Sequence, residues 1–105
     1  MGQINKMTTF GKFIKTEREK RKWTQTEFGA KIGINASAIS RIESGSQNFS
    51  KSKLKELSEL FKIQSQQVTD LFFADKFAKE AFLLQKKLQI ITTILILNKE
   101  NLNYE

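Results

Sequence analysis

The chain has 105 residues, 39% of them hydrophobic, and its 18 basic and 11 acidic side chains give a net charge of +7. It contains no histidine, cysteine or proline. Without cysteine or histidine, disulfides, thiolate zinc sites and the commonest general base are excluded, so we expect no cofactor and no metal site. The length suits one compact domain with an appendage, and because no apolar signal-like run opens the chain we expect a cytoplasmic protein.

The charge is concentrated in one half of the chain. Residues 1–62 hold 13 basic and 6 acidic side chains, whereas residues 63–105 hold five of each. A basic excess confined to one half is typical of a protein that binds a polyanion. The alternative is a basic surface that only keeps the protein in solution.

The first predicted helix covers residues 9–20. Phe10, Phe13 and Ile14 have the three- and four-residue spacing of one buried helical face. Trp23 follows in the connection to the next helix, where we expect it to pack into the core rather than to stack on a base.

Two short helices joined by a tight turn are predicted next. Thr24 and Glu27 have the spacing of a capping box at the start of the first of them. Gly33 suits the sharp exit from that helix, Asn35 can cap the following one, and Gly45 can end it. A helix, a glycine turn and a second short helix form the unit that places a recognition helix in the major groove of DNA.

A fourth helix is predicted after Ser50 or Ser52, either of which can cap it, and a fifth over residues 65–73. Their apolar positions recur with helical spacing, so we expect them to be buried. These positions are Leu54, Leu57, Leu60, Phe61, Ile63, Val68, Leu71 and Phe72.

A sixth helix is predicted from a cap at Asp75 to about Asn98, because apolar residues there follow two heptad series. The two series are Ala81, Leu88, Leu95 and Leu102, and Phe77, Leu84, Ile91 and Asn98. The branched run over residues 90–97 is also compatible with a strand, and it is too short to span a bilayer. A helix that folds back on its own domain is an alternative, but an apolar face this wide favours a second copy of the chain, so we expect a homodimer and no membrane contact.

The stretch from about Phe10 to Phe72 resembles the Cro/repressor-type (XRE) helix-turn-helix family. The matching elements are Thr24-Gln25, Phe28-Gly29 at the family's leucine–alanine position, Gly33, Ile39-Ser40-Arg41-Ile42-Glu43 and Gly45. The resemblance implies an all-α fold with a five-helix lambda-repressor-like domain over residues 9–73. Outside it we expect an N-terminal extension over 1–8 and, from the heptad series, a long C-terminal dimerisation helix and tail over 74–105. Phe28-Gly29 departs from the family pattern and predicts a shift in the packing between helices.

Arg41 is the first candidate for reading a base, because its guanidinium can give two hydrogen bonds to one guanine, worth about 1–3 kcal/mol of discrimination. The resemblance places Ala36, Ser37, Ser40 and Arg41 where the family reads DNA, although Ala36 offers only an apolar contact. Phosphates are expected at Gln25, Asn35, Ser46, Gln47, Asn48, Lys51 and Lys53, since helix N-termini and lysines attract anions. The resemblance also implies that Arg18 and Glu43 form a structural ion pair.

These expectations favour a regulator of transcription that binds double-stranded DNA as a homodimer on an inverted repeat. A phage-type repressor, an antitoxin and a restriction–modification controller all fit the size, and residues 71–78 look like short regulators that accompany DNA methyltransferases. The alternative is an antitoxin-type interaction module whose last helix binds a partner protein. An enzyme is not expected, because no acid–base or nucleophile constellation is evident. The dimer seam is predicted at Phe77, Ala81, Leu84, Leu88, Ile91 and Leu95.

Overall fold

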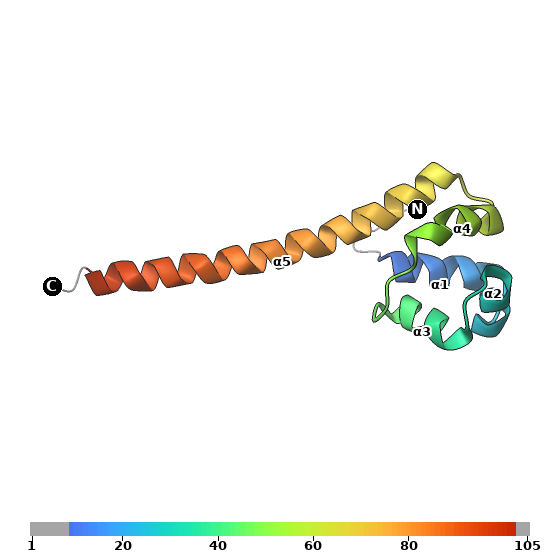
Figure 1. Ribbon diagram of the computed structural model, residues 1–105, viewed down its shortest axis with the longest axis horizontal. Helices are drawn as coiled ribbons and strands as arrows, with labels where there is room; N and C mark the ends of the chain where they lie inside the picture. Colours follow the sequence, from blue (N-terminus) through green and yellow to red (C-terminus); the bar gives the residue numbers. More distant parts are fainter. Residues whose placement is uncertain (1–8, 103–105) are drawn as a thin grey trace. The chain divides into compact units, whose positions relative to one another are not determined.

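The computed structural model describes residues 9–102, with side chains to residue 99, and within these residues the protein is all-α, as predicted. The elements are α1 (Phe10–Lys20), α2 (Gln25–Ile32), α3 (Ala36–Ser44), the 3₁₀ turn η1 (Lys51–Lys53), α4 (Leu54–Phe61) and α5 (Ser65–Leu102) (Figure 1). Contacts divide the chain into two compact units, Met1–Asp75 and Lys76–Glu105. None of the described helices is long and apolar enough to cross a membrane.

The predicted starts and ends of the first three helices are confirmed. Thr9 accepts a hydrogen bond from the backbone of Lys12 at 3.1 Å, and Asn35 accepts one from Ala38 at 2.8 Å. Thr24 and Glu27 form a complete capping box at the start of α2. These bonds satisfy backbone donors that the first turn of a helix leaves free.

The ends of α2 and α3 lie at Gly33 and Gly45, whose φ angles of 74° and 91° are in the left-handed region. Glycine adopts this region without steric cost, which allows the sharp exits that the sequence predicts. α4 ends instead at Lys62, with a φ of 58°, where no glycine is available.

Aromatic side chains make up much of the core of the first unit. Phe28 and Phe61 are fully buried, and their rings stack with centroids 5.6 Å apart. Trp23 stacks on both from one side, so its predicted role in packing is confirmed. Val68 and Phe72 join the same core and thereby attach the first turns of α5 to α1–α4.

Two glycines allow helices to approach more closely than other residues would permit. A Cβ atom on Gly11 would overlap the carbonyl oxygen of Ile42 in α3, and one on Gly29 would overlap the carbonyl oxygen of Ile34. The departure at Gly29 from the family pattern therefore has a steric reason. The backbone leading into α3 lies directly against α2 at this position.

Three local predictions are wrong. Ser50 and Ser52 bond to each other at 2.9 Å, and no side chain caps η1 or α4. Leu71 is 41% exposed, because it lies at the edge of the α5 face that buries Val68 and Phe72. Asp75 begins no new helix, since neither glycine nor proline lies near it and α5 continues through it.

Residues 90–97 are helical, which excludes the strand alternative. Leu102 lies outside the residues with described side chains.

The contact at Gly11 predicts an unusual response to alanine. Glycine to alanine inside a helix normally stabilises it by up to about 1 kcal/mol, because alanine has the higher helix propensity. At Gly11 the new methyl group must displace the backbone of α3, so we expect Gly11→Ala to lower the free energy of unfolding by about 1–3 kcal/mol. Urea titration measures it, with Lys12→Ala, an exposed change in the same turn, as the control. A stabilised Gly11→Ala protein would contradict the close approach.

Candidate nucleic-acid interface

The third helix presents a buried apolar face and an exposed polar face. Ala38, Ile39 and Ile42 are buried in the first unit, and so is Glu43. The opposite face carries the side chains predicted to read bases, of which Ser37, Ser40 and Arg41 are exposed and Ala36 is half-buried. A short helix held by one face, with small and polar groups on the other, has the form of a helix that enters a DNA groove.

A buried ion pair connects this helix to the first one. The Arg18 Nε donates to Glu43 Oε2 at 2.7 Å, and Arg18 Nη2 donates to Glu43 Oε1 at 3.0 Å. Both side chains are about nine-tenths buried or more. Hydrogen bonding to Glu43 raises the pKa of the Arg18 guanidinium above its usual value, against the opposing effect of burial. The structure therefore brings these two residues together in a bidentate pair that holds α3 against α1.

Gln25 extends this pair to the beginning of α2. Its Nε2 donates to Glu43 Oε1 at 3.0 Å, and Arg18 Nη1 donates to the carbonyl oxygen of Trp23 at 2.8 Å. The first turn of α2 and the end of α3 are thus held by the same two charged groups. Gln25 is half-buried, and its second amide hydrogen remains available to an anion at the N-terminus of α2.

The side chain of Arg41 is held by the turn that follows α3. Its Nε donates to Gln47 Oε1 at 2.8 Å. Gln47 is exposed, as are its neighbours Ser46 and Asn48. The Asn35 side chain lies at the other end of α3, where its oxygen caps the helix.

The two lysines predicted to bind phosphate differ in their surroundings. Lys51 is exposed, with its Nζ 5.6 Å from the centre of the Phe73 ring. Lys53 is half-buried, and its Nζ lies 3.5 Å from Glu56 Oε1. The carboxylate partly neutralises Lys53, so Lys51 is the stronger candidate of the two for an anion.

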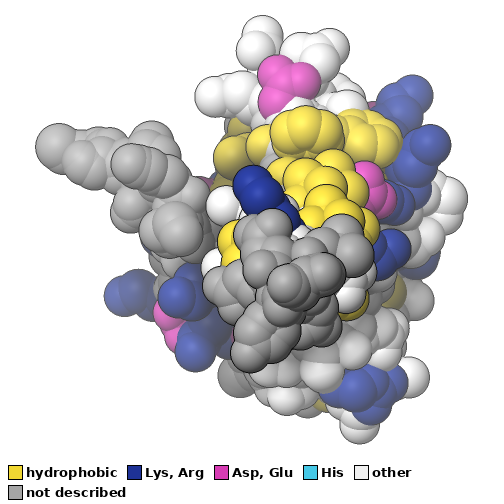
Figure 2. All heavy atoms as spheres, turned by 90° about the vertical axis from the view of Figure 1, so that its left-hand side faces the viewer, with side chains coloured by type: hydrophobic (Ala, Val, Ile, Leu, Met, Phe, Trp, Pro, Cys, Tyr) yellow, Lys and Arg dark blue, Asp and Glu magenta, His cyan; other side chains and the backbone are white. Residues whose placement is uncertain are grey.

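The predicted dimer seam lies on α5, and all six of its side chains are exposed. Phe77 is 71% exposed and Leu88 54%. Figure 2 shows hydrophobic side chains at the surface of the molecule. Large apolar residues are rarely left in water in such numbers without a binding role.

The sequence did not reveal three contacts of this region. These are the approach of α3 to Gly11, the bond from Gln25 to Glu43, and the bond from Arg41 to Gln47. A small residue facing α3 from α1 was the one available signal for the first. The other two join side chains whose proximity depends on how the helices and the turn pack. Among the described residues no cluster of acidic side chains is arranged to hold a metal ion.

Comparison with known proteins adds a family match and one curated relative. Residues 14–67, about half of the chain, match the family described as "Helix-turn-helix". The chain is also similar to the HTH-type transcriptional repressor RghR of Bacillus subtilis (strain 168), with 38% identity over 58 residues. The aligned stretch covers 54% of this chain and 43% of that protein, so the chain corresponds to less than half of this relative.

The buried pair predicts a large loss of stability when one partner is removed. Arg18→Ala leaves the Glu43 carboxylate buried without its main donor, so we expect the free energy of unfolding to fall by about 3–5 kcal/mol. Lys20→Ala is the control, since it removes the exposed Lys20 from its ion pair with Glu17, at an N–O distance of 3.1 Å, while Glu17 stays bonded to Arg21. We expect this change to cost at most about 1 kcal/mol. Equal losses for the two variants in urea titrations would contradict the role of Arg18.

Proposed function

The chain belongs to the XRE-type helix-turn-helix family, and on this premise we propose that it is a sequence-specific DNA-binding regulator of transcription. We further propose that it acts as a homodimer on an inverted-repeat operator, as a repressor or a restriction–modification controller. The observation that carries the proposal is the exposed face of α3, held in place by the Arg18–Glu43 pair at its other face. The family is one of DNA-binding modules, so the proposal includes no enzymatic activity.

Base reading is assigned to the exposed face of α3. Arg41 reads a guanine, while Ser37 and Ser40 give hydrogen bonds that are less selective. Ala36 contacts a thymine methyl group. With few polar readers, part of the sequence preference comes from DNA shape.

Phosphate binding is assigned to the ends of α2 and α3 and to the lysines that follow. The N-terminus of α2 at Gln25 and that of α3 at Asn35 offer backbone donors and partial positive charge. Ser46, Gln47, Asn48, Lys51 and Lys53 complete this set. The excess of seven positive charges in residues 1–62 supports the assignment, because every phosphate contact releases a counterion.

Dimerisation is assigned to α5 through the seam Phe77, Ala81, Leu84, Leu88, Ile91 and Leu95. These positions alternate by three and four residues over three heptads, which is the spacing of a two-stranded coiled coil. A two-fold dimer presents two recognition helices to half-sites one turn of DNA apart, about 34–36 Å, or a multiple of it. The preferred operator is therefore an inverted repeat.

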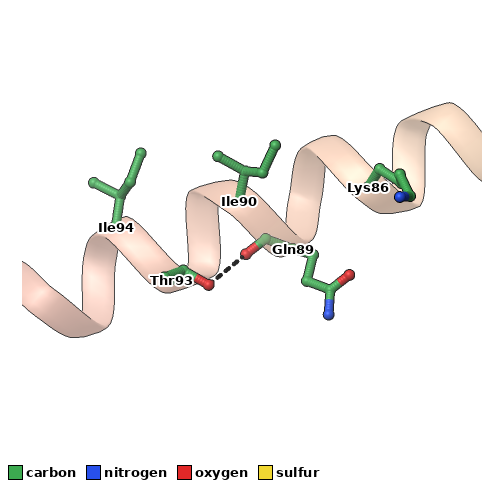
Figure 3. Close-up of a pocket in the computed structure, with 5 residues that line it drawn as sticks. All are labelled: Lys86, Gln89, Ile90, Thr93 and Ile94. Carbon is green, nitrogen blue, oxygen red and sulfur yellow. Dashed lines mark hydrogen bonds between the residues drawn. The ribbon is translucent and has the colours of Figure 1, made fainter.

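A second candidate function is supported by another stripe on the same helix. Leu83, Ile90, Ile94 and Leu97 are exposed and recur with helical spacing. Leu83 precedes the seam residue Leu84 by one position, so this stripe lies about 100° away around the helix. Figure 3 shows Ile90 and Ile94 on one side of α5, in a shallow hollow that Lys86, Gln89 and Thr93 complete. A two-stranded coil leaves this stripe open, which favours an antitoxin-type module whose helix also binds a partner protein.

The assignment of Arg41 predicts a specific defect in Arg41→Ala. Selection from a random duplex pool should give an inverted repeat for the wild type, and the variant should lose the preference for one guanine in each half-site. We expect this to cost about 5- to 150-fold in binding at that base pair, with an unchanged melting temperature. Lys51→Ala is the control, since loss of a phosphate contact weakens all duplexes alike and reduces the salt dependence. An unaltered base preference in Arg41→Ala would exclude Arg41 as a reader.

The seam predicts that charge on α5 separates the subunits. Leu88→Asp combined with Leu95→Asp should give a monomer by light scattering, because the carboxylates cannot be buried against a second helix. The monomer should bind a full operator at least about 100-fold more weakly than the wild type, since the second half-site is no longer tethered.

Gln89→Asp combined with Thr93→Asp is the control, because it adds the same charges to the same part of α5 outside the seam. A monomeric wild type at micromolar concentration would overturn the dimer and favour the interaction module. If both double variants remain dimers, the dimer interface lies outside this seam.

A further inference from the structure

The side chains of Arg41 and Gln47 bond to each other at the exposed end of α3, and this contact joins a predicted base reader to the turn beyond the helix. The Arg41 Nε donates to Gln47 Oε1 at 2.8 Å. A guanidinium has donors and no acceptor, so only the amide oxygen of Gln47 can face it. The amide nitrogen of Gln47 must then lie on the other side of its side chain, with both of its hydrogens free of Arg41.

The backbone of the same turn is fixed on Arg41 as well. The N–H groups of Ser46 and Gln47 both donate to the Arg41 carbonyl oxygen, at 3.0 and 3.2 Å, and the Ser44 hydroxyl donates to it at 3.1 Å. Gly45 makes this turn possible through its left-handed φ of 91°. Gln47 is thus placed beside Arg41 by two backbone bonds that do not involve its own side chain.

This arrangement determines which part of Arg41 remains available. With Nε bonded to Gln47, the two terminal nitrogens Nη1 and Nη2 form a planar fork of donors at the tip of the side chain. Such a fork matches the O6 and N7 acceptors of one guanine. An exposed arginine otherwise samples many rotamers and loses that freedom on binding, so a side chain that is already held binds at a smaller entropic cost.

We propose that Gln47 is a positioning residue for base recognition, which holds Arg41 through its amide oxygen while its amide nitrogen donates to a DNA phosphate. This inference rests on the proposed function and deepens it, because it makes the guanine preference depend on a residue that touches no base. It also joins a phosphate contact to a base contact through one side chain. Binding to the backbone in the correct register then strengthens the orientation of Arg41.

Two substitutions separate the two roles of Gln47. Gln47→Lys keeps a donor for the phosphate but removes the acceptor for Arg41 and places a like charge beside it. Gln47→Glu keeps an acceptor for Arg41 but places a negative charge beside the phosphate. The first should therefore lose base preference with little loss of affinity, and the second should lose affinity with little loss of base preference.

The measurement is fluorescence anisotropy with the full chain and two duplexes, the selected operator and the same operator with the guanine of each half-site replaced by adenine. The ratio of the two Kd values reports base preference. We expect Gln47→Lys to lower this ratio at least about threefold toward the Arg41→Ala value, and Gln47→Glu to keep it while Kd rises about tenfold or more on both duplexes. Asn48→Ala is the matched control, which should weaken both duplexes alike and leave the ratio unchanged.

A wild-type ratio in Gln47→Lys would overturn the positioning role while leaving the proposed function intact. A ratio that falls equally in Gln47→Lys, Gln47→Glu and Asn48→Ala would also overturn it, since that pattern indicates a turn that has lost its structure. Failure of the wild type to prefer any sequence would instead refute the proposed function, and this inference with it. Melting temperatures of all variants show whether each is folded.

Discussion

The bidentate contact between Arg18 and Glu43 is the interaction on which the position of the third helix depends. It joins residues 25 positions apart in the sequence, and it is nearly excluded from water. The same guanidinium holds the carbonyl of Trp23, and the same carboxylate accepts from Gln25, so α1, α2 and α3 meet at one charged group. Removing Arg18 leaves the buried Glu43 carboxylate beside the neutral Gln25 amide, without its cationic partner. We expect this to cost far more than the loss of any exposed ion pair in the domain.

An apolar pair of similar volume is often at least as stable as a buried ion pair, so stability alone does not explain why charges are used here. A carboxylate can accept several hydrogen bonds in fixed directions, whereas an apolar side chain accepts none. Glu43 uses this capacity to bond both Arg18 and Gln25, the latter at the end of α2 that we assign to a phosphate. The polar pair thus connects the core to side chains of the surface that we assign to DNA binding. Close packing at Gly11 fixes the distance between α1 and α3, and the ion pair fixes their orientation.

Local signals in the sequence predicted local structure well. The capping box at Thr24 and Glu27, the cap at Asn35 and the glycine exits at Gly33 and Gly45 all depend on residues within a few positions of each other. Predictions that depend on the environment were less reliable. Asp75 is a residue type that often caps a helix, but α5 continues through it. Leu71 is as hydrophobic as a core residue, but it lies at the edge of the buried face of α5 and is 41% exposed. The contact between Arg41 and Gln47 follows from a turn geometry that no spacing rule encodes, so the site was predicted as a set of residues and not as a network.

The described part of the unit Lys76–Glu105 differs from the first unit in that its large apolar side chains are exposed to solvent. Within its described part, large apolar side chains occupy most faces of α5, and all of them are at least half exposed. Thr92 and Thr93 are β-branched and bond back to the carbonyls of Leu88 and Gln89, which weakens rather than strengthens the intrinsic preference for a helix. A helix of this kind gains most of its stability from packing against another surface. In the dimer that we propose, formation of this helix is linked to association, so the population of the paired state depends on protein concentration. If two paired recognition helices bind two half-sites, as we propose, operator occupancy also depends on this association. It then rises more steeply with protein concentration than it would for an independent monomer.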